Sequence, residues 1–345
     1  MGPLGCLLGM TTESEANTAA TGPSDALAGA VGESWRSFLQ SCEPLRPELY
    51  RYCRYLTRSP WDADDLVQDT LAKAFVTLGC LHQTLENPRA WLFRVASNVW
   101  LNRMRAQREL PHPAPLGDAA QVGEHAELRA TREAAGTLLG RLAPQERAAV
   151  VLKDVFDLSL EEIAEGLSTS VGAVKAALHR GRGKLSEPDA TDDALPVPVP
   201  AVLDAFCEAF NARDLNGLTA LLLDTVVSEF PGLTIEYGAK QAATHSLRGV
   251  LFGDPAGQYS PIGRAYRAGL QSRPPRLELR VHRGEPLLLG WFLHDDGEAV
   301  RAISRVTVDG DKVSRMATYM HAPEVLAEIC AELRVPYRSS GYRYW

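Results

Sequence analysis

Residues 159–184 read SLEEIAEGLSTSVGAVKAALHRGRGK, and this stretch decides the fold of the middle of the chain. Ser159 and Glu162 form a capping box, in which two side chains satisfy backbone N–H groups at the start of a helix. The short helix that follows has the small Ala164 where a second helix must cross closely. The next residues, Ser168–Ser170, predict a turn whose last serine can cap that second helix. The stretch therefore predicts a helix-turn-helix.

The second helix of this motif has an apolar inner face and a basic outer face. Val174 and Leu178 recur at helical spacing and are predicted to point inward. The segment from Ser170 to Lys184 contains no acid, so its outer face suits DNA. A solvated basic surface is the alternative for the charges taken alone. The residues predicted for the groove are Ser170, Val171, Gly172, Lys175, Ala176 and His179, and those predicted near phosphates are Arg180, Arg182 and Lys184.

An acidic helix is predicted earlier in the chain, over SPWDADDLVQDTLAKAFVTL at residues 59–78. Its apolar residues recur at helical spacing and predict a core face made of Val67, Leu71, Ala74, Phe75 and Leu78. Its other face is predicted to carry Asp64, Asp65, Gln68 and Asp69. Carboxylates that share one helix face repel one another, so this cluster indicates a basic partner.

The helix expected next, over residues 89–108, has five arginines and no acid. Leu92, Ala96 and Val99 predict its core face, while Arg94, Asn98, Leu101 and Arg105 are predicted on the opposite face. Arginine and asparagine together can bind phosphates and base edges. The alternative is an arginine-rich solvated surface.

Composition indicates a soluble globular protein with no metal site. The 345 residues are 45% hydrophobic and 23% charged, with a net charge of −7, so the two basic segments are local exceptions. The six cysteines and eight histidines show no spacing typical of metal ligands or a disulfide framework, and no cofactor motif occurs. No apolar run is long enough to span a membrane, and a cytoplasmic location is expected. Translation could start at Met1 or Met10.

Composition also divides the chain into domains. After Ala201, helical spacing of apolar residues gives way to short alternating segments separated by GE, DDG and DGD turns. This pattern predicts α+β structure with strands at 277–283, 286–294, 299–308 and 312–320. The predicted divisions are a disordered segment 1–34, a helical domain 35–108, a linker 109–133, a helix-turn-helix domain 134–186, a Pro-rich linker 187–200, an α+β domain 201–333 and an aromatic, basic tail 334–345.

The two helical blocks resemble the extracytoplasmic-function (ECF) sigma factors of the sigma-70 family. The resemblance rests on DADDLVQDT at residues 62–70, PRAWL at 88–92 with Asn98, LAPQER at 142–147, LSLEEIA at 158–164 and SVGAVK at 170–175, all in the family's order. It implies core RNA polymerase and promoter DNA as partners. One departure is Ala176-Ala177, where the family often has Ser-Arg, which weakens any inferred −35 contact there.

The resemblance also assigns roles to residues. The acidic residues Asp64, Asp65, Gln68 and Asp69 would bind core polymerase, and the helix-turn-helix would read the −35 element. The −10 element would be held by Arg89, Arg94, Asn98 and Arg105. Whether a separate anti-sigma factor exists stays open.

Residues 201–333 resemble the SnoaL-like, NTF2-like cone fold, so the chain is expected to be multidomain, with two all-α sigma domains followed by an α+β domain. Some sigma factors carry such a domain as a regulator. We expect it to hold the sigma domains in a set arrangement, which a small-molecule ligand in its pocket or a partner changes, with the tail 335–345 as mediator.

An enzyme is the alternative class of function, because relatives of this fold use an Asp or His as general base. The pocket candidates are His245, Asp254, His294 and His321. None of them has an evident catalytic partner in the sequence, so we expect no catalytic residue. A simple helix-turn-helix repressor is a third interpretation, but it leaves the acidic helix unexplained.

Overall fold

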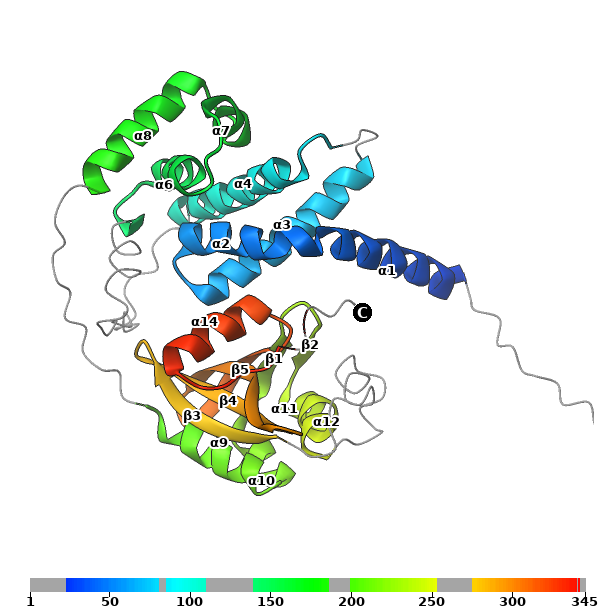
Figure 1. The fold of residues 1–345 in the computed structure, drawn as a ribbon. Helices are drawn as coiled ribbons and strands as arrows, with labels where there is room; N and C mark the ends of the chain where they lie inside the picture. The colour runs from blue at the N-terminus through cyan, green and yellow to red at the C-terminus, as the bar shows by residue number, and fades with distance from the viewer. Residues whose placement is uncertain are drawn as a thin grey trace, which may run out of the picture.

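The computed structural model describes residues 23–80, 85–109, 139–185, 199–252, 275–339 and 341. Figure 1 shows the N-terminal and central helices in the upper part of the view and a sheet with flanking helices below them. The described part thus has two all-α blocks followed by an α+β domain, which confirms the predicted fold class.

The first block contains four long helices. They are α1 (Pro23–Cys42), α2 (Arg46–Thr57), α3 (Pro60–Cys80) and α4 (Pro88–Glu109), with a 3₁₀ turn at Glu43–Leu45 before α2. The prediction of disorder through residue 34 was wrong from Pro23 onward. The end of α1 packs on α3: the Trp35 and Phe38 rings lie 5.1 Å and 5.5 Å from the ring of Phe75. This long-range packing stabilises a helix in a segment whose composition alone predicts disorder.

The second block is the predicted helix-turn-helix with one helix before it. Its elements are α6 (Pro144–Val150), a π-helical segment at Val151–Val155, α7 (Leu160–Gly166) and α8 (Val171–Leu185). The capping box is present, because the Glu162 N–H donates to Ser159 Oγ at 3.1 Å and the Ser159 N–H donates to the Glu162 carboxylate at 2.8 Å. Val174 and Leu178 are buried as predicted.

The C-terminal domain is built on one six-stranded sheet of order β2-β1-β6-β5-β4-β3. Strand β1 pairs with β6 in parallel, and the other neighbours are antiparallel. The last four strands lie where the turn signals predicted them. The strands are β1 (Leu222–Phe230), β2 (Thr234–Tyr237), β3 (Arg276–His282), β4 (Glu285–His294), β5 (Gly297–Asp309) and β6 (Lys312–Tyr319).

Helices cover both faces of this sheet. On one side lie α9 (Ala201–Asn211), α10 (Leu215–Ala220), α11 (Ala239–Thr244) and α12 (Ser246–Phe252). On the other side, α14 (Pro323–Leu333) lies between the sheet and the helical blocks (Figure 1). Leu287 and Leu289 therefore belong to the core cluster of the helical blocks, whereas Leu288 between them belongs to the cluster with α9.

The two helical blocks pack on each other through aromatic rings. Phe156, after the π-helical segment, lies 5.6 Å from the Tyr52 ring of α2 and 4.9 Å from the Phe93 ring of α4. The Arg147 guanidinium of α6 donates to the Leu56 carbonyl at 2.6 Å. The second block is therefore docked on the first, in a closed arrangement.

Gly181 is required where α8 crosses α6. A Cβ at Gly181 would lie 2.8 Å from Val150 Cγ2, whereas one at Gly183 would meet nothing within 4 Å. We expect Gly181→Ala to lower the free energy of unfolding by about 1–3 kcal/mol through overpacking. Gly183→Ala is the matched control and should raise it by roughly 0.5–1 kcal/mol, because alanine favours a helix. Urea denaturation would check both, and equal effects would contradict this packing.

Candidate nucleic-acid interfaces and the C-terminal cavity

The outer face of α8 is exposed and borders a groove. Lys175, His179 and Arg182 line this groove of about 460 Å³ together with Lys153 from the π-helical segment. Lys153 was missed by the sequence analysis, because it lies outside the helix-turn-helix and only the fold brings it beside α8. Among the residues predicted for DNA, Ser170, Gly172, Lys175, Ala176, His179, Arg180 and Arg182 are exposed, and Val171 and Lys184 are half-buried.

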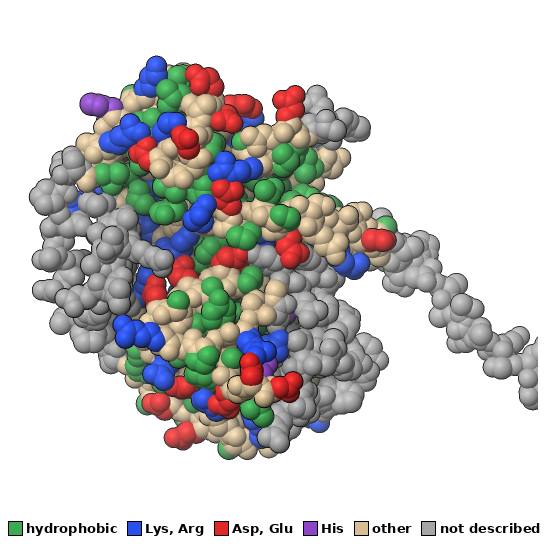
Figure 2. All heavy atoms as spheres, viewed as in Figure 1, with side chains coloured by type: hydrophobic (Ala, Val, Ile, Leu, Met, Phe, Trp, Pro, Cys, Tyr) green, Lys and Arg blue, Asp and Glu red, His purple; other side chains and the backbone are tan. Residues whose placement is uncertain are grey.

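The predicted phosphate contacts are engaged within the chain. Glu146 of α6 accepts hydrogen bonds from Arg180 Nε at 2.9 Å and Lys184 Nζ at 2.7 Å. Burial alone would raise the pKa of Glu146, but these cationic donors outweigh it and hold the pKa below its usual range. Arg182 pairs with Asp154. In the view of Figure 2, basic and acidic side chains are interspersed over these upper helices.

The predicted −10 surface on α4 is partly occupied by the helix-turn-helix. Arg89 donates to the Glu48 carboxylate at 2.7 Å and 2.8 Å, and its guanidinium lies 5.9 Å from the Phe156 ring centroid. Arg94 forms an ion pair with Glu165 of α7. Two of the four predicted residues therefore contact the second block or stand at its edge.

The other predicted residues of α4 lie along its more open part. Asn98 is half-buried, and Arg105 is exposed and donates to the side-chain oxygen of Asn102 at 2.8 Å. Leu101 was predicted on the polar face, but it is buried. The core-facing stripe of α4 is wider than an i, i+3, i+4 pattern suggests, because the second block packs on it as well.

Asp64 does not belong to the exposed acidic face of α3, contrary to the prediction. Its side chain is only 1% exposed and lies 3.5 Å from the Arg46 guanidinium of α2. Gln68 Nε2 donates to its other oxygen at 2.7 Å. Burial raises the pKa of Asp64, against the charge of Arg46. Asp64 therefore ties α3 to α2.

The remaining residues of the acidic face border the C-terminal domain. A cleft of about 270 Å³ is lined by Gln68 and Asp69 on one side and by the turn 231–233 and His321 on the other. Asp65 is exposed beside this cleft. The pKa of Asp65 is raised to about 6, mainly because neighbouring atoms remove part of the hydration of its carboxylate. The negative charges of Asp64, Asp62 and, across the interface, Glu229 raise it further. The C-terminal domain thus stands against the surface predicted for polymerase.

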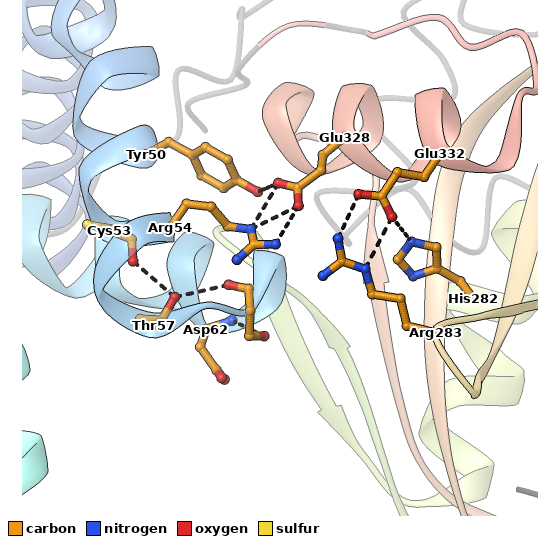
Figure 3. A network of polar contacts seen from close by, with 10 residues as sticks. Tyr50, Cys53, Arg54, Thr57, Asp62, His282, Arg283, Glu328 and Glu332 are labelled. Atoms are coloured by element: carbon orange, nitrogen blue, oxygen red, sulfur yellow. Dashed lines mark hydrogen bonds and ion pairs between the residues drawn. The ribbon is translucent and has the colours of Figure 1, made fainter. Parts of the chain in front are cut away.

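The contact between α14 and α2 is centred on Glu328 (Figure 3). Its carboxylate accepts from Arg54 Nε at 2.9 Å and 3.1 Å and from the Tyr50 hydroxyl at 3.1 Å. One turn later, Glu332 binds His282 and Arg283 of its own domain. Burial opposes ionisation of Glu332, but these two donors lower its pKa to about 2. Of two acids one turn apart on α14, Glu328 therefore binds α2 and Glu332 binds its own domain.

A second contact lies around Trp61 of α3. The Trp61 indole donates to the Glu285 carboxylate at 3.2 Å, and its ring lies 4.7 Å from the Tyr319 ring. The Arg305 guanidinium covers the Trp61 ring at 5.2 Å. Trp61 therefore joins α3 to strands β4, β5 and β6.

The C-terminal tail contacts its own domain. The Pro336 carbonyl accepts from the Val300 N–H, and the Arg338 N–H donates to the Val300 carbonyl, each at 2.9 Å. Arg338 also pairs with Asp296. The described tail residues 335–339 thus lie alongside the start of β5, and these polar contacts stay within the C-terminal domain. This does not support the predicted mediator role for 335–339; residues 340 and 342–345 of the tail lie outside the described part.

The C-terminal domain contains an apolar cavity of about 60 Å³ between its sheet and its helices. Phe206 and Phe210 of α9 line it opposite Phe292 of β4 and Met316 of β6. The prediction of pocket acids and bases was wrong for the described residues, because His245, His294 and His321 do not line the cavity. Asp254 lies outside the described residues. His321 instead faces the cleft beside Asp69.

Other site classes find no support in the described ranges. Within them, no group of three or more His, Cys, Asp or Glu side chains is arranged to hold a metal ion. Cysteines 42, 53, 80, 207 and 330 are free thiols. Among the helices that the structure describes, none is both long and apolar enough to cross a membrane.

Comparisons with known proteins agree with the two helical blocks. Residues 42–109 match the family model for Sigma-70 region 2, and residues 132–185 match that for Sigma-70, region 4. The ECF RNA polymerase sigma factor SigG of Mycobacterium tuberculosis is 30% identical over 239 residues, which cover 59% of this chain and 64% of SigG. The match thus spans slightly less than two thirds of that relative.

Two further proteins of the same organism are similar. SigM, also an ECF RNA polymerase sigma factor, is 32% identical over 161 residues, which cover 46% of this chain and 81% of SigM. The crystal structure of the extracytoplasmic-function sigma factor SigJ covers 84% of this chain and 98% of its own, with 23% identity and a TM-score of 0.32. With both region models matched in order and most of SigM covered, the chain belongs to the ECF RNA polymerase sigma factors.

Proposed function

We propose that this protein binds core RNA polymerase and directs it to promoters, with no covalent chemistry of its own. The observation that carries the proposal is α8, the second helix of a capped helix-turn-helix, which contains no acid and presents Lys175, His179 and Arg182 on its outer face. Such a helix suits the major groove of the −35 element. Region 2 would hold the −10 element through α4, and Asp65, Gln68 and Asp69 of α3 would bind the polymerase.

The closed arrangement of regions 2 and 4 would have to open on a promoter. The −10 and −35 elements are about 25 base pairs apart, which is roughly 85 Å of B-DNA at about 3.4 Å per base pair. Region 4 is packed on region 2 here, with Arg94 of α4 bound to Glu165 of α7. The two helices therefore cannot reach both elements at once in this arrangement. We take it as a resting state.

The C-terminal domain would act as a built-in regulator of polymerase binding. It contacts region 2 through Glu328, Trp61 and the turn 231–233, and this turn lies beside Gln68. A polymerase surface that approached Gln68 and Asp69 would compete with it. The sequence-based hypothesis had the domain holding regions 2 and 4 together; the contacts favour competition on region 2.

The first prediction separates base-reading from phosphate-binding residues. Lys175→Ala and His179→Ala should reduce transcription only from promoters with the matching −35 element. Each lost base contact should remove about 1–3 kcal/mol of discrimination against other sequences. Arg182→Ala should weaken binding to all sequences and reduce the salt slope by about one. Run-off transcription over a −35 library, with exposed Arg280→Ala as control, would check this. The same loss on every promoter for all three variants would contradict the division.

The second prediction concerns the clamp between α14 and α2. Glu328→Gln weakens charge-assisted hydrogen bonds to Arg54, each worth about 1.5–3 kcal/mol. We expect core polymerase to bind this variant roughly tenfold more tightly, since about 1.4 kcal/mol is tenfold in affinity. Glu332→Gln is the matched control on the same helix and should leave core affinity unchanged. Core affinity measured by fluorescence anisotropy would check both, and a weaker binding of Glu328→Gln would refute a competing domain.

The third prediction uses the raised pKa of Asp65. Because this pKa is about 6 in the folded chain and near 3.8 otherwise, the folded chain binds an extra proton between those values. The associated destabilisation is absent below the ordinary value of 3.8, grows as the pH rises toward 6 and is fully present above it. Asp65→Asn should therefore raise the melting temperature more at pH 7.5 than at pH 5, whereas Asp204→Asn on α9 should show no such difference. A gain independent of pH would contradict the assignment.

A further inference from the structure

The apolar cavity of the C-terminal domain lies directly behind the contact with region 2. It is enclosed by aromatic and methionine side chains from both layers of the domain. The cavity lies on one face of the sheet, and the opposite face of the same strands packs on α14 and α3. Six of the lining residues are Phe206, Phe210, Phe230, Phe292, Met316 and Met320.

The polar groups of the cavity are neutral. Ser304 and Thr318 face each other across β5 and β6, with their hydroxyl oxygens 2.8 Å apart, and Ser246 adds a third hydroxyl. None of the described lining residues carries a charge. A charged ligand would lose its hydration without compensation, whereas each hydroxyl can make more than one hydrogen bond. The cavity therefore suits an uncharged, mostly apolar molecule with a hydroxyl or carbonyl group.

The size of the cavity requires its walls to move when a ligand binds. Its volume is about 60 Å³, whereas a dry cavity that binds benzene measures about 150 Å³. Methionine side chains are flexible and repack readily. Met316 and Met320 are therefore the wall residues expected to shift.

Strand alternation connects these walls to region 2. Along β6 and its continuation, Met316, Thr318 and Met320 face the cavity. Tyr319 between them packs on Trp61, and His321 borders the cleft with Gln68. Where the walls move by a displacement of the β6 backbone, the residues between the cavity-facing ones move with it.

A second connection runs through the end of β1. Phe230 lines the cavity, and Pro231 and Gly232 directly after it line the cleft beside Gln68 and Asp69. Expansion of the cavity would therefore displace both segments that border the acidic face of α3, namely the end of β6 with His321 and the turn 231–233.

We propose that this cavity binds a small uncharged organic molecule with one hydroxyl or carbonyl group, and that binding loosens the contact of Tyr319, His321 and the turn 231–233 with α3. The occupied state would leave Asp65, Gln68 and Asp69 more accessible. Only this last consequence rests on the proposed function; binding and its transmission to Trp61 do not.

The test uses the full chain and p-cresol as the probe. Methyl-labelled methionine gives five signals, of which Met316 and Met320 report on the cavity and Met104 on region 2. Fluorotryptophan labelling adds six signals, and Trp61→Phe identifies the one at the interface. We expect p-cresol to shift Met316, Met320 and Trp61 with one saturation curve, while Met104 and the buried Trp100 stay unchanged.

Variants and a charged analogue control this experiment. Ala302→Leu fills the cavity and should weaken p-cresol binding by roughly tenfold or more, since overpacked cores resist insertion. Exposed Ala212→Leu in the same domain should bind normally. Thr318→Val keeps the side-chain shape and should weaken p-cresol but not toluene. The anion 4-hydroxybenzoate should not bind.

The outcomes are separable. The absence of a saturable shift at Met316 and Met320, or equal binding of 4-hydroxybenzoate, would overturn the ligand class. Binding that leaves Trp61 unchanged would overturn the coupling. No polymerase or DNA is present, so either failure leaves the proposed transcription function standing, and a failure of that function leaves this result intact.

Discussion

The arrangement of this protein depends on helix α2 being enclosed from several sides. Tyr52 of α2 is fully buried, with its hydroxyl 2.7 Å from Ser97 of α4 and its ring against Phe156 of region 4. On another side of the same helix, Tyr50 and Arg54 hold Glu328 of the C-terminal domain. Both other domains therefore pack on region 2, and neither can move without exposing part of this helix to water.

Under the proposed function, this placement would make activation an exchange of the contacts that region 2 makes with the other two domains. The surfaces proposed for polymerase and the −10 element lie on α3 and α4, and each is bordered by another domain of the same chain. Domains joined by a short linker meet at an effective concentration of the order of millimolar, so modest contacts are populated. Polymerase and promoter would therefore have to replace contacts such as that of Arg94 with Glu165, as the proposed competition requires.

The sequence predicted the elements whose signals are local. The capping box, the turn at 168–170 and the turns between the last four strands predicted their positions correctly, because each depends on neighbouring residues alone. The predictions from sequence were wrong where packing against a residue distant in the chain determines the structure. Helix α1 needs Phe75, Asp64 is drawn inward by Arg46, and Leu101 is covered by packing that no single-helix pattern contains. The histidines expected in the pocket lie outside the cavity lining, because His245 follows α11, His294 ends β4 and His321 follows β6, and the sequence does not show which ends the fold turns toward the cavity.

The ion pairs on region 4 affect how it would recognise DNA. Arg180, Lys184 and Arg182 already bind Glu146 and Asp154, so the positive field of α8 is partly neutralised before any contact with DNA. The pair of Arg182 with Asp154 is exposed, and such pairs are worth only about 0–1 kcal/mol, so a phosphate can replace Asp154 at little cost. Glu146 is buried, so drawing Arg180 and Lys184 away from it would cost more. Nonspecific attraction, which depends on the uncompensated field, is weakened more than contacts made at close range. In a chain of net charge −7, this would favour binding where the proposed base contacts of Lys175 and His179 add to the phosphate contacts.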